Sequence, residues 1–288
     1  MDGIIIINKE KSWTSNDIVQ KIKHICHEKV GHAGTLDPLA TGVLPILVGK
    51  GTLLSKYLIN HDKEYISTIK LGQKRDTGDS EGKVIEEKYV DKVILQRDNI
   101  EKVLKTFIGK QTQIPPMYSA IKVKGKKLYE YARKGEQINV TPREIEIYAI
   151  ELVSILEEAQ EIKFKVKCSK GTYIRTLSED IALKLGTVGY MKELERTQVG
   201  DFYIDNSVKI SNAEKDGLEK YLITIEDFFK SKEKIVLEDI ELKRFLNGVK
   251  IKINRADEIY KIYDNNLQFI GIGQIYGRFL KRDICINQ

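Results

Sequence analysis

The stretch Gly31-His32-Ala33-Gly34-Thr35-Leu36-Asp37-Pro38-Leu39-Ala40-Thr41-Gly42 separates an amphipathic segment from an apolar run that ends at Val48. Its glycines permit tight turns and close approach of the backbone, and Pro38 disfavours helical backbone at Asp37. The pattern therefore predicts a loop that holds one carboxylate between two packed elements. Loops of this kind often carry chemistry. The commoner use of Asp-Pro is a turn, or a helix N-cap followed by proline at the first helical position.

Composition indicates a soluble globular protein with one large domain, or one large and one small domain. The chain has 288 residues, of which 41% are hydrophobic and 31% charged, and its net charge of +6 favours a polyanionic partner. No apolar run approaches the roughly 20 residues of a membrane span, and the N-terminus lacks a basic leader. The cysteines, Cys26, Cys168 and Cys285, are isolated, so neither a disulfide framework nor a CxxC pair is visible. We therefore expect a cytoplasmic protein without a membrane partner.

Hydrophobic patterning predicts strands and helices along most of the chain. Continuous β-branched runs and strict alternation are typical of strands, and apolar stripes at a 3.6-residue spacing are typical of helices. Thr14 and Asp17 resemble a capping box at the start of the first helix. The predicted strands are residues 4–7, 64–71, 145–155 and 161–169, and residues 43–48 form an apolar run. The predicted helices are residues 15–30, about 100–108, 175–185, a short helix with Met191 and Leu194, and 240–246.

Three motif-like patterns are excluded by their spacing. A phosphate loop fails because Leu44 stands where glycine is needed and Gly51 replaces the hydroxyl that would bind magnesium. The acidic segment 76–82 lacks the ligand spacing of a calcium loop, so it predicts a hairpin connection. His24 and His27 lie three residues apart near a helix end without further ligands, which favours two solvated histidines. The sequence therefore predicts no metal site.

Two segments indicate contact with a polyanion or with a carboxylate. Four lysines between residues 122 and 127 surround Tyr118, Tyr129 and Tyr131. Basic residues interleaved with aromatics suit phosphate contact and base stacking, although a solvated lysine-rich surface fits equally well. Arg175 follows a predicted strand and opens a predicted helix. Because arginine is rarely buried without a carboxylate partner, Arg175 needs one.

The sequence changes character after about Lys230. A short charged stretch precedes a helix over 240–246, Gly248 ends that helix, and short strand-like runs follow. We therefore predict two domains, residues 1–230 and a compact β-rich module over residues 231–288, near the lower size limit for independent folding.

Four blocks of the sequence resemble the TruB family of tRNA pseudouridine synthases. The block 31–42 is similar to the catalytic motif of that family and is nearly diagnostic. The segments 113–122, 168–175 and 194–202 resemble further family blocks in the same order. The resemblance spans most of residues 3–205. It implies a mixed α+β fold with a central, largely antiparallel sheet flanked by helices, followed by a PUA-type RNA-binding module.

The resemblance also implies functions for single residues. Asp37 matches the essential catalytic aspartate, and Arg175 matches the arginine that pairs with it. Tyr65 matches the tyrosine that stacks on the target uracil. Pocket-lining positions match Tyr173 and Leu194, and the histidine that contacts the opened T-loop matches His32.

Two departures from the family pattern concern the N-terminal loop and the segment after Val48. The family usually shows Lys-Pro and then Gly before Thr-Ser, whereas here Glu10 follows Lys9 and Ser12 replaces Gly. The segment 49–52 reads Gly-Lys-Gly-Thr instead of the commoner Gly-Glu-Ala-Thr.

The resemblance implies isomerisation of a uridine in the T-loop of tRNA, expected at position 55, to pseudouridine. The reaction breaks N1–C1′ and forms C5–C1′ without adding or losing atoms, so we expect no cofactor and no metal. A carboxylate is ionised at pH 7 and can serve as nucleophile or base. We expect a monomer that binds the T-arm of tRNA without an obligate protein partner. The alternatives are a non-catalytic tRNA-binding or folding protein and a synthase that acts on another RNA.

Overall fold

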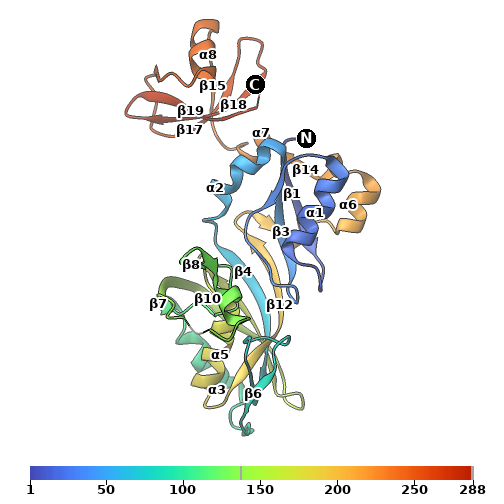
Figure 1. The fold of residues 1–288 in the computed structure, drawn as a ribbon. Helices are drawn as coiled ribbons and strands as arrows, with labels where there is room; N and C mark the ends of the chain where they lie inside the picture. The colour runs from blue at the N-terminus through green and yellow to red at the C-terminus, as the bar shows by residue number, and fades with distance from the viewer. Residues whose placement is uncertain (137, 287–288) are drawn as a thin grey trace.

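A long, largely antiparallel sheet organises the fold in a computed structural model, which describes residues 1–136 and 138–286 (Figure 1). The strands of this sheet are β1 (Gly3–Lys9), β2 (Val30–His32), β3 (Thr41–Val48), β4 (Lys63–Leu71), β7 (Gly109–Gln113), β10 (Arg143–Leu156), β11 (Glu161–Cys168), β12 (Gly189–Val199), β13 (Phe202–Tyr203) and β14 (Leu222–Thr224). They are ordered β14-β1-β3-β12-β4-β11-β10-β7, with β2 beside β3 and β13 beside β12. The contact between β3 and β12 is parallel, whereas the neighbouring contacts of β3, β12 and β4 are antiparallel. The predicted mixed α+β class with a largely antiparallel sheet is confirmed.

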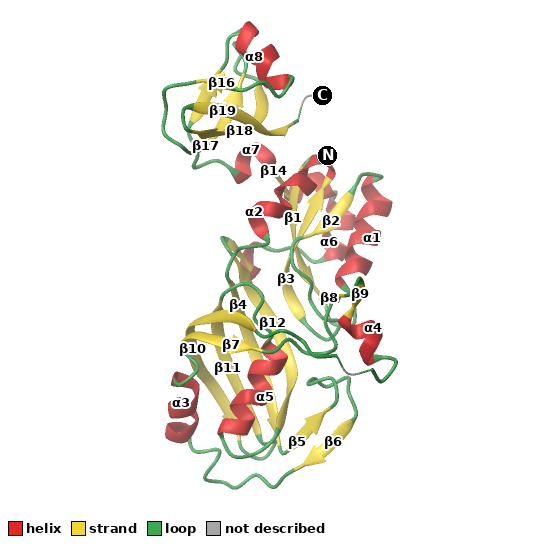
Figure 2. Cartoon of the chain, turned by 60° about the vertical axis from the view of Figure 1, so that its left-hand side comes forward, coloured by secondary structure: helices red, strands yellow, loops and turns green. Residues whose placement is uncertain are grey.

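Helices and small hairpins flank this sheet (Figure 2). They are α1 (Ser15–Cys26), α2 (Ser55–Leu58), α3 (Arg97–Lys105), α4 (Leu128–Ala132), α5 (Ile174–Lys184), α6 (Ile210–Asp216), α7 (Ile225–Phe228), and the hairpins β5 (Gln73–Arg75) with β6 (Val84–Glu87) and β8 (Lys122–Val123) with β9 (Lys126–Lys127). Helix α5 packs on β12 and β4, and α3 packs on β10. The β5–β6 pair confirms that the acidic segment 76–82 connects a hairpin.

Strand β1 is buried on both faces, which explains its continuous run of isoleucines. Ile5 and Ile7 belong to the main core, which also holds the stripes of α1 and α5. Ile4 and Ile6 point to the opposite face and belong to a second cluster. Because successive side chains of a strand alternate between faces, a strand between two cores has no polar positions in its interior.

The segment with Met191 and Leu194 is strand β12, so the predicted short helix was wrong. The register with β4 shifts between Met191, which faces Ile69, and Leu194, which faces Ser67. This β-bulge inserts one extra residue, so two apolar residues three apart share one face of the sheet. Apolar residues three apart therefore fit one face of a helix as well as one face of a bulged strand. Here the segment is a strand because it is buried at the centre of the sheet.

The first helix is shorter than its predicted apolar stripe. Thr14 and Asp17 form the predicted capping box at its start. The helix ends at His27, which adopts a left-handed conformation with φ of 56° and donates its backbone N–H to Lys23. Val30 therefore lies in β2 and not in the helix. His24 and His27 are exposed, as predicted.

The C-terminal part of the chain forms a second sheet with one helix. Its elements are β15 (Lys234–Val236), α8 (Asp239–Leu246), β16 (Ile251–Lys252), β17 (Ile259–Tyr263), β18 (Phe269–Tyr276) and β19 (Phe279–Cys285). The strand order is β15-β17-β18-β19-β16, and Phe245 of α8 is buried against this sheet. The predicted β-rich module and its helix over 240–246 are confirmed, and the division at residue 230 stays a prediction.

This C-terminal sheet shares apolar packing with the main unit. Phe269, Ile272 and Ile284 belong to the same buried cluster as Leu58 and Phe229. Figure 1 shows α7 and α2 between the two sheets. Among the described residues, no helix is long and apolar enough to span a membrane.

Candidate active site

Asp37 lies in the loop between β2 and β3. Its backbone carbonyl accepts a hydrogen bond from the Ala40 N–H at 3.1 Å, and no helix follows Pro38 in this described stretch, so Asp37 is a turn residue and not a helix N-cap. Pro38 O accepts the backbone N–H of Ser12 at 2.9 Å. Leu36 is buried and its N–H is bonded to the Ser15 hydroxyl at 2.8 Å. The loop is thus tied on both sides of Asp37, whose side chain is 35% exposed.

Arg175, in the first turn of α5, is the ion-pair partner of Asp37. Its Nε lies 3.1 Å from Asp37 Oδ2, and a second nitrogen lies 3.5 Å from Oδ1. The guanidinium is 6% exposed and also faces the buried Asp79 carboxylate at 3.7 Å. It donates to Tyr118 O at 2.7 Å and to Thr77 O at 3.2 Å. The carboxylate partner that the sequence required is therefore present, and the plane of the guanidinium is fixed by four residues.

Burial and the neighbouring cations have opposite effects on the pKa of Asp37. Burial raises the pKa of the Asp37 carboxyl, and the nearby Asp79 raises it further. The Arg175 guanidinium lowers it, with a smaller contribution from Lys9. Arg175 therefore favours the ionised form of a carboxylate that its surroundings partly desolvate.

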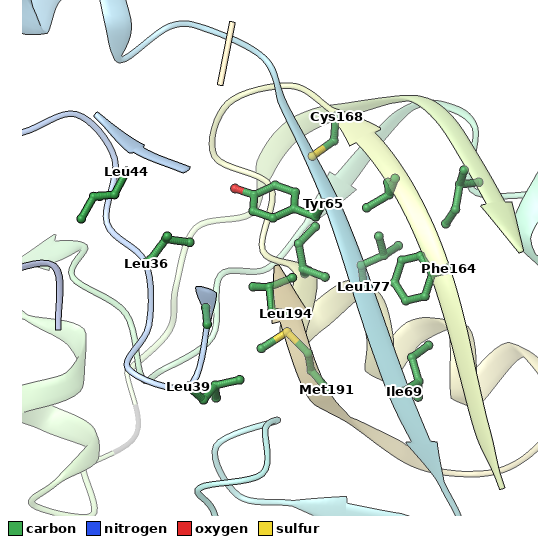
Figure 3. Packing of buried hydrophobic residues seen from close by; sticks show 14 of the residues in the cluster. Leu36, Leu39, Leu44, Tyr65, Ile69, Phe164, Cys168, Leu177, Met191 and Leu194 are labelled. Carbon is green, nitrogen blue, oxygen red and sulfur yellow. The ribbon is translucent and has the colours of Figure 1, made fainter. Parts of the chain in front are cut away.

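A cavity of about 490 Å³ opens beside the Asp37–Arg175 pair. Tyr65, Tyr173 and Leu194 line it with Asp37 and Arg175, so the structure brings together five of the six predicted site residues. Figure 3 shows the Tyr65 hydroxyl pointing from β4 toward the loop that carries Leu36. Burial raises the pKa of Tyr65 to about 12, so the phenol is protonated at neutral pH.

His32 lies apart from the cavity. It is in β2, opposite Ile46 of β3, and does not belong to the residues that line this cavity in the described part of the chain. Its side chain is half-buried, and burial lowers the pKa of the imidazole. The proposed contact of His32 with an opened T-loop stays a prediction.

The lysine-rich segment after Tyr118 forms the β8–β9 hairpin and α4. Lys127 and Arg133 each lie 5.3 Å from the centroid of the Tyr129 ring. The predicted combination of basic side chains and an aromatic ring is therefore present at Tyr129. Tyr131 differs, because it is buried and its hydroxyl donates to Val123 O at 3.1 Å. Tyr131 is therefore a packing residue of this segment and does not present a ring for stacking.

Comparison with known proteins places this site in a family. Residues 22–174 match the model of the TruB family pseudouridylate synthase N-terminal domain. The chain belongs to the TruB family. Residues 175–245 match the tRNA pseudouridylate synthase B C-terminal domain, and residues 234–278 match the C-terminal model of pseudouridine synthase II TruB. The predicted resemblance is confirmed.

Similar proteins of the TruB family cover nearly the whole chain. The tRNA pseudouridine synthase B of Clostridium tetani is 42% identical over 281 residues, covering 95% of this chain and 96% of the relative. The protein of the same name from Clostridium kluyveri is 42% identical over 280 residues, with 95% of each chain covered. A crystal structure of a Cbf5-Nop10-Gar1 complex contains a chain with 26% identity and a TM-score of 0.67, covering 94% of this chain and 78% of that one.

Three charged residues of this TruB-family site were missed by the sequence analysis. Lys9 is fully buried at the end of β1 and donates to Trp13 O at 2.6 Å and Pro38 O at 3.2 Å, and burial lowers its pKa to about 8. Asp79 belongs to the acidic segment that was interpreted only as a hairpin connection. Arg196 lies in the matched segment 194–202 but was not singled out. A buried charge has no periodic signature, so only the block resemblance could have pointed to these positions.

Proposed function

We propose that this protein isomerises a uridine in the T-loop of tRNA, expected at position 55, to pseudouridine, with Asp37 as the catalytic aspartate. The observation that carries the proposal is the Asp37 carboxylate, held 3.1 Å from Arg175 beside a cavity lined by Tyr65. Membership of the TruB family supports the reaction class, and relatives named tRNA pseudouridine synthase B support tRNA as the substrate.

The geometry suits the chemistry of base rotation. The reaction breaks N1–C1′ and joins C5 to C1′; the hydrogen of C5 leaves as a proton, and N1 takes up a proton. Ionised Asp37 can attack the nucleoside or remove a proton, and Arg175 favours this ionised form by opposing the rise in pKa that burial causes. The Tyr65 ring offers a face on which a uracil taken out of its stack can lie. Tyr173 and Leu194 limit the space around that base.

The remaining parts of the proposal concern the partner and its binding surface. The net charge of +6 and the cations beside Tyr129 favour phosphate contacts with the T-arm. We expect the module over residues 231–288 to be PUA-like and to add RNA contacts. We expect a monomer that works in the cytoplasm, and light scattering of the purified protein tests the oligomeric state.

Release of tritium tests the proposed reaction. A T-arm stem–loop with tritium at C5 of its uridines releases label to water only when C5 joins C1′, and nuclease digestion then locates the pseudouridine. We expect turnover on the T-arm and none on a ribosomal stem–loop. We expect Asp37→Asn to bind the T-arm but to release less than a hundredth of the label, because an amide is neither nucleophile nor base. Turnover confined to the ribosomal fragment, or tight T-arm binding without turnover by the wild type, would establish one of the alternatives.

A further inference from the structure

Arg196 is a fully buried arginine at the centre of the sheet. It is 1% exposed and is the largest fully buried side chain in the described part of the molecule. Strand β12 places it between two site segments, because it lies opposite Tyr65 of β4 on one side and opposite Gly42 of β3 on the other. Between β1 and β11 in the sheet order, β3 and β12 are the only parallel neighbours among the described residues. This pairing places Arg196 opposite Gly42, at the end of the Asp37 loop.

The bonding partners of Arg196 are backbone carbonyls and not carboxylates. Within residues 1–136 and 138–286 it forms no ion pair, and it donates to Val43 O at 2.7 Å, Gly34 O at 3.0 Å and Thr35 O at 3.5 Å. A buried cation without a counter-charge opposes folding, and an apolar side chain would fill the same volume without that penalty. A guanidinium, however, presents five N–H donors in one rigid plane and can therefore hold several carbonyls at fixed directions.

The loop and the strand are also fitted to each other sterically. A Cβ on Gly42 would lie 2.2 Å from the backbone O of Arg196, and Gly42 has a φ of 102°. The loop that carries Asp37 therefore begins at carbonyls that Arg196 binds and ends against the Arg196 backbone.

Arg196 also lies beside the second group that faces the cavity, because its position on β12 is opposite Tyr65 of β4. Its guanidinium lowers the pKa of the Tyr65 hydroxyl, against the larger rise that burial causes. A guanidinium has no acceptor atom, so it can act on the phenolic oxygen only as a donor. Both residues line the cavity beside Asp37.

We propose that Arg196 is a positioning residue that fixes the Asp37 loop and the Tyr65 hydroxyl relative to each other. This inference rests on the proposed function for its kinetic consequences, but the loop restraint it describes is independent of any activity. It assigns a structural function to a buried cation that forms no ion pair within the part of the chain that the structure describes. It also predicts that Arg196 affects the rate of the chemical step and not the binding of RNA.

Hydrogen exchange tests the loop restraint without reference to activity. We expect Arg196→Met to increase amide exchange in residues 31–42 at least tenfold, while exchange in β18 and β19 stays within threefold of the wild type. Lys192→Met is the matched control, because Lys192 lies on the same strand, is 40% exposed and pairs with Glu161 at 2.6 Å. Unchanged exchange in residues 31–42 of Arg196→Met, or an equal increase in Lys192→Met, would overturn the proposal.

Kinetics test the link to Tyr65, once wild-type turnover on the T-arm stem–loop has been measured. We expect Arg196→Met to lower the single-turnover rate at least thirtyfold and to change the Kd for RNA less than threefold. The effects of Arg196→Met and Tyr65→Phe should not multiply, because both act on one hydroxyl. A rate within threefold of the wild type, or fully multiplicative effects, would refute the assignment. An inactive wild type would instead contradict the proposed function.

A conservative variant covers the case in which Arg196→Met does not fold. Arg196→Lys keeps the cation but replaces the planar fork by one ammonium that cannot reach the same set of acceptors. We expect Arg196→Lys to fold, to bind RNA like the wild type and to react at least tenfold more slowly. Wild-type kinetics for Arg196→Lys would show that only the charge is needed and would overturn the positioning assignment.

Discussion

Replacing Arg175 by leucine leaves two carboxylates without their cation. In the wild type the guanidinium is 6% exposed and lies 3.1 Å from Asp37 and 3.7 Å from Asp79. Breaking a buried pair by removing one partner typically costs about 3–5 kcal/mol, and the 35% exposure of the Asp37 side chain places this case at the lower end. We therefore expect Arg175→Leu to lower the free energy of unfolding by about 3 kcal/mol at pH 7. For a chain of this size that corresponds to a fall in Tm of about 6–12 °C.

The loss should depend on pH with a definite sign. Burial raises the pKa of Asp37, and Arg175 opposes that rise, so the variant has a still higher folded-state pKa. The folded variant then holds its proton more tightly than the unfolded chain, so its stability falls as the pH rises above the unfolded value of 3.8. The difference in stability between wild type and variant should therefore be large at about pH 7.5 and small at about pH 4.5.

Urea unfolding at both pH values measures this difference, and the exposed pair of Arg97 and Glu101 provides a control. That pair has a similar distance of 2.9 Å, but its side chains are 57% and 38% exposed, so Arg97→Leu should cost less than about 1 kcal/mol at either pH. Turnover of Arg175→Leu should fall by orders of magnitude. A stability gap that stays constant between the two pH values would refute the argument that Arg175 acts by keeping Asp37 ionised.

Three further changes test other parts of the molecule. Tyr65→Phe should bind the T-arm stem–loop within threefold of the wild type but react at least a hundredfold more slowly in single turnover. Positioned proton transfer by the hydroxyl contributes roughly 10²–10⁴-fold in rate. A wild-type rate would show that the Tyr65 ring only stacks on the base. Ser12→Gly should raise the free energy of unfolding by about 0.5 kcal/mol, because Ser12 has a φ of 73°, which glycine adopts without strain. This relief of strain outweighs the greater conformational freedom of glycine in the unfolded chain. A loss of stability would mean that the Ser12 side chain stabilises the loop. Deleting residues 231–288 uncovers Leu58 and Phe229, so the shortened chain should have a lower Tm and, if the module contacts phosphates, a shallower slope of log affinity against log salt. An unchanged Tm would show that the shared cluster adds no stability.

The elements that could be predicted are those whose local sequence pattern matches the structure they form in the folded chain. The isoleucine run became a doubly buried strand, the Thr14–Asp17 pair became a capping box, and residues 161–168 became a strand with alternating faces. Asp37 and Arg175 were predicted as a pair because of the family resemblance and because a buried arginine needs a carboxylate, and their side chains meet.

The parts that could not be predicted depend on contacts between distant segments. Met191 and Leu194 fit a helix equally well until the bulge and the position between β3 and β4 are known. Lys9 and Arg196 look like ordinary surface cations in the sequence, because nothing local shows that both will be fully buried against loop carbonyls. Asp79 was hidden in the same way within a hairpin connection.

The position of β12 in the sheet has a consequence for synthesis of the chain. Strand β12 (Gly189–Val199) separates β3 from β4, although both of those strands are complete by Leu71. At translation rates of about 5–20 residues per second, the facing edges of β3 and β4 wait on the order of ten seconds for their common neighbour. Unpaired edges are surfaces on which chains associate with one another, so this interval is when the growing chain is most exposed to such association. The Asp37 loop acquires this neighbour only when Arg196 has been added, so a growing chain has no assembled active site before that point.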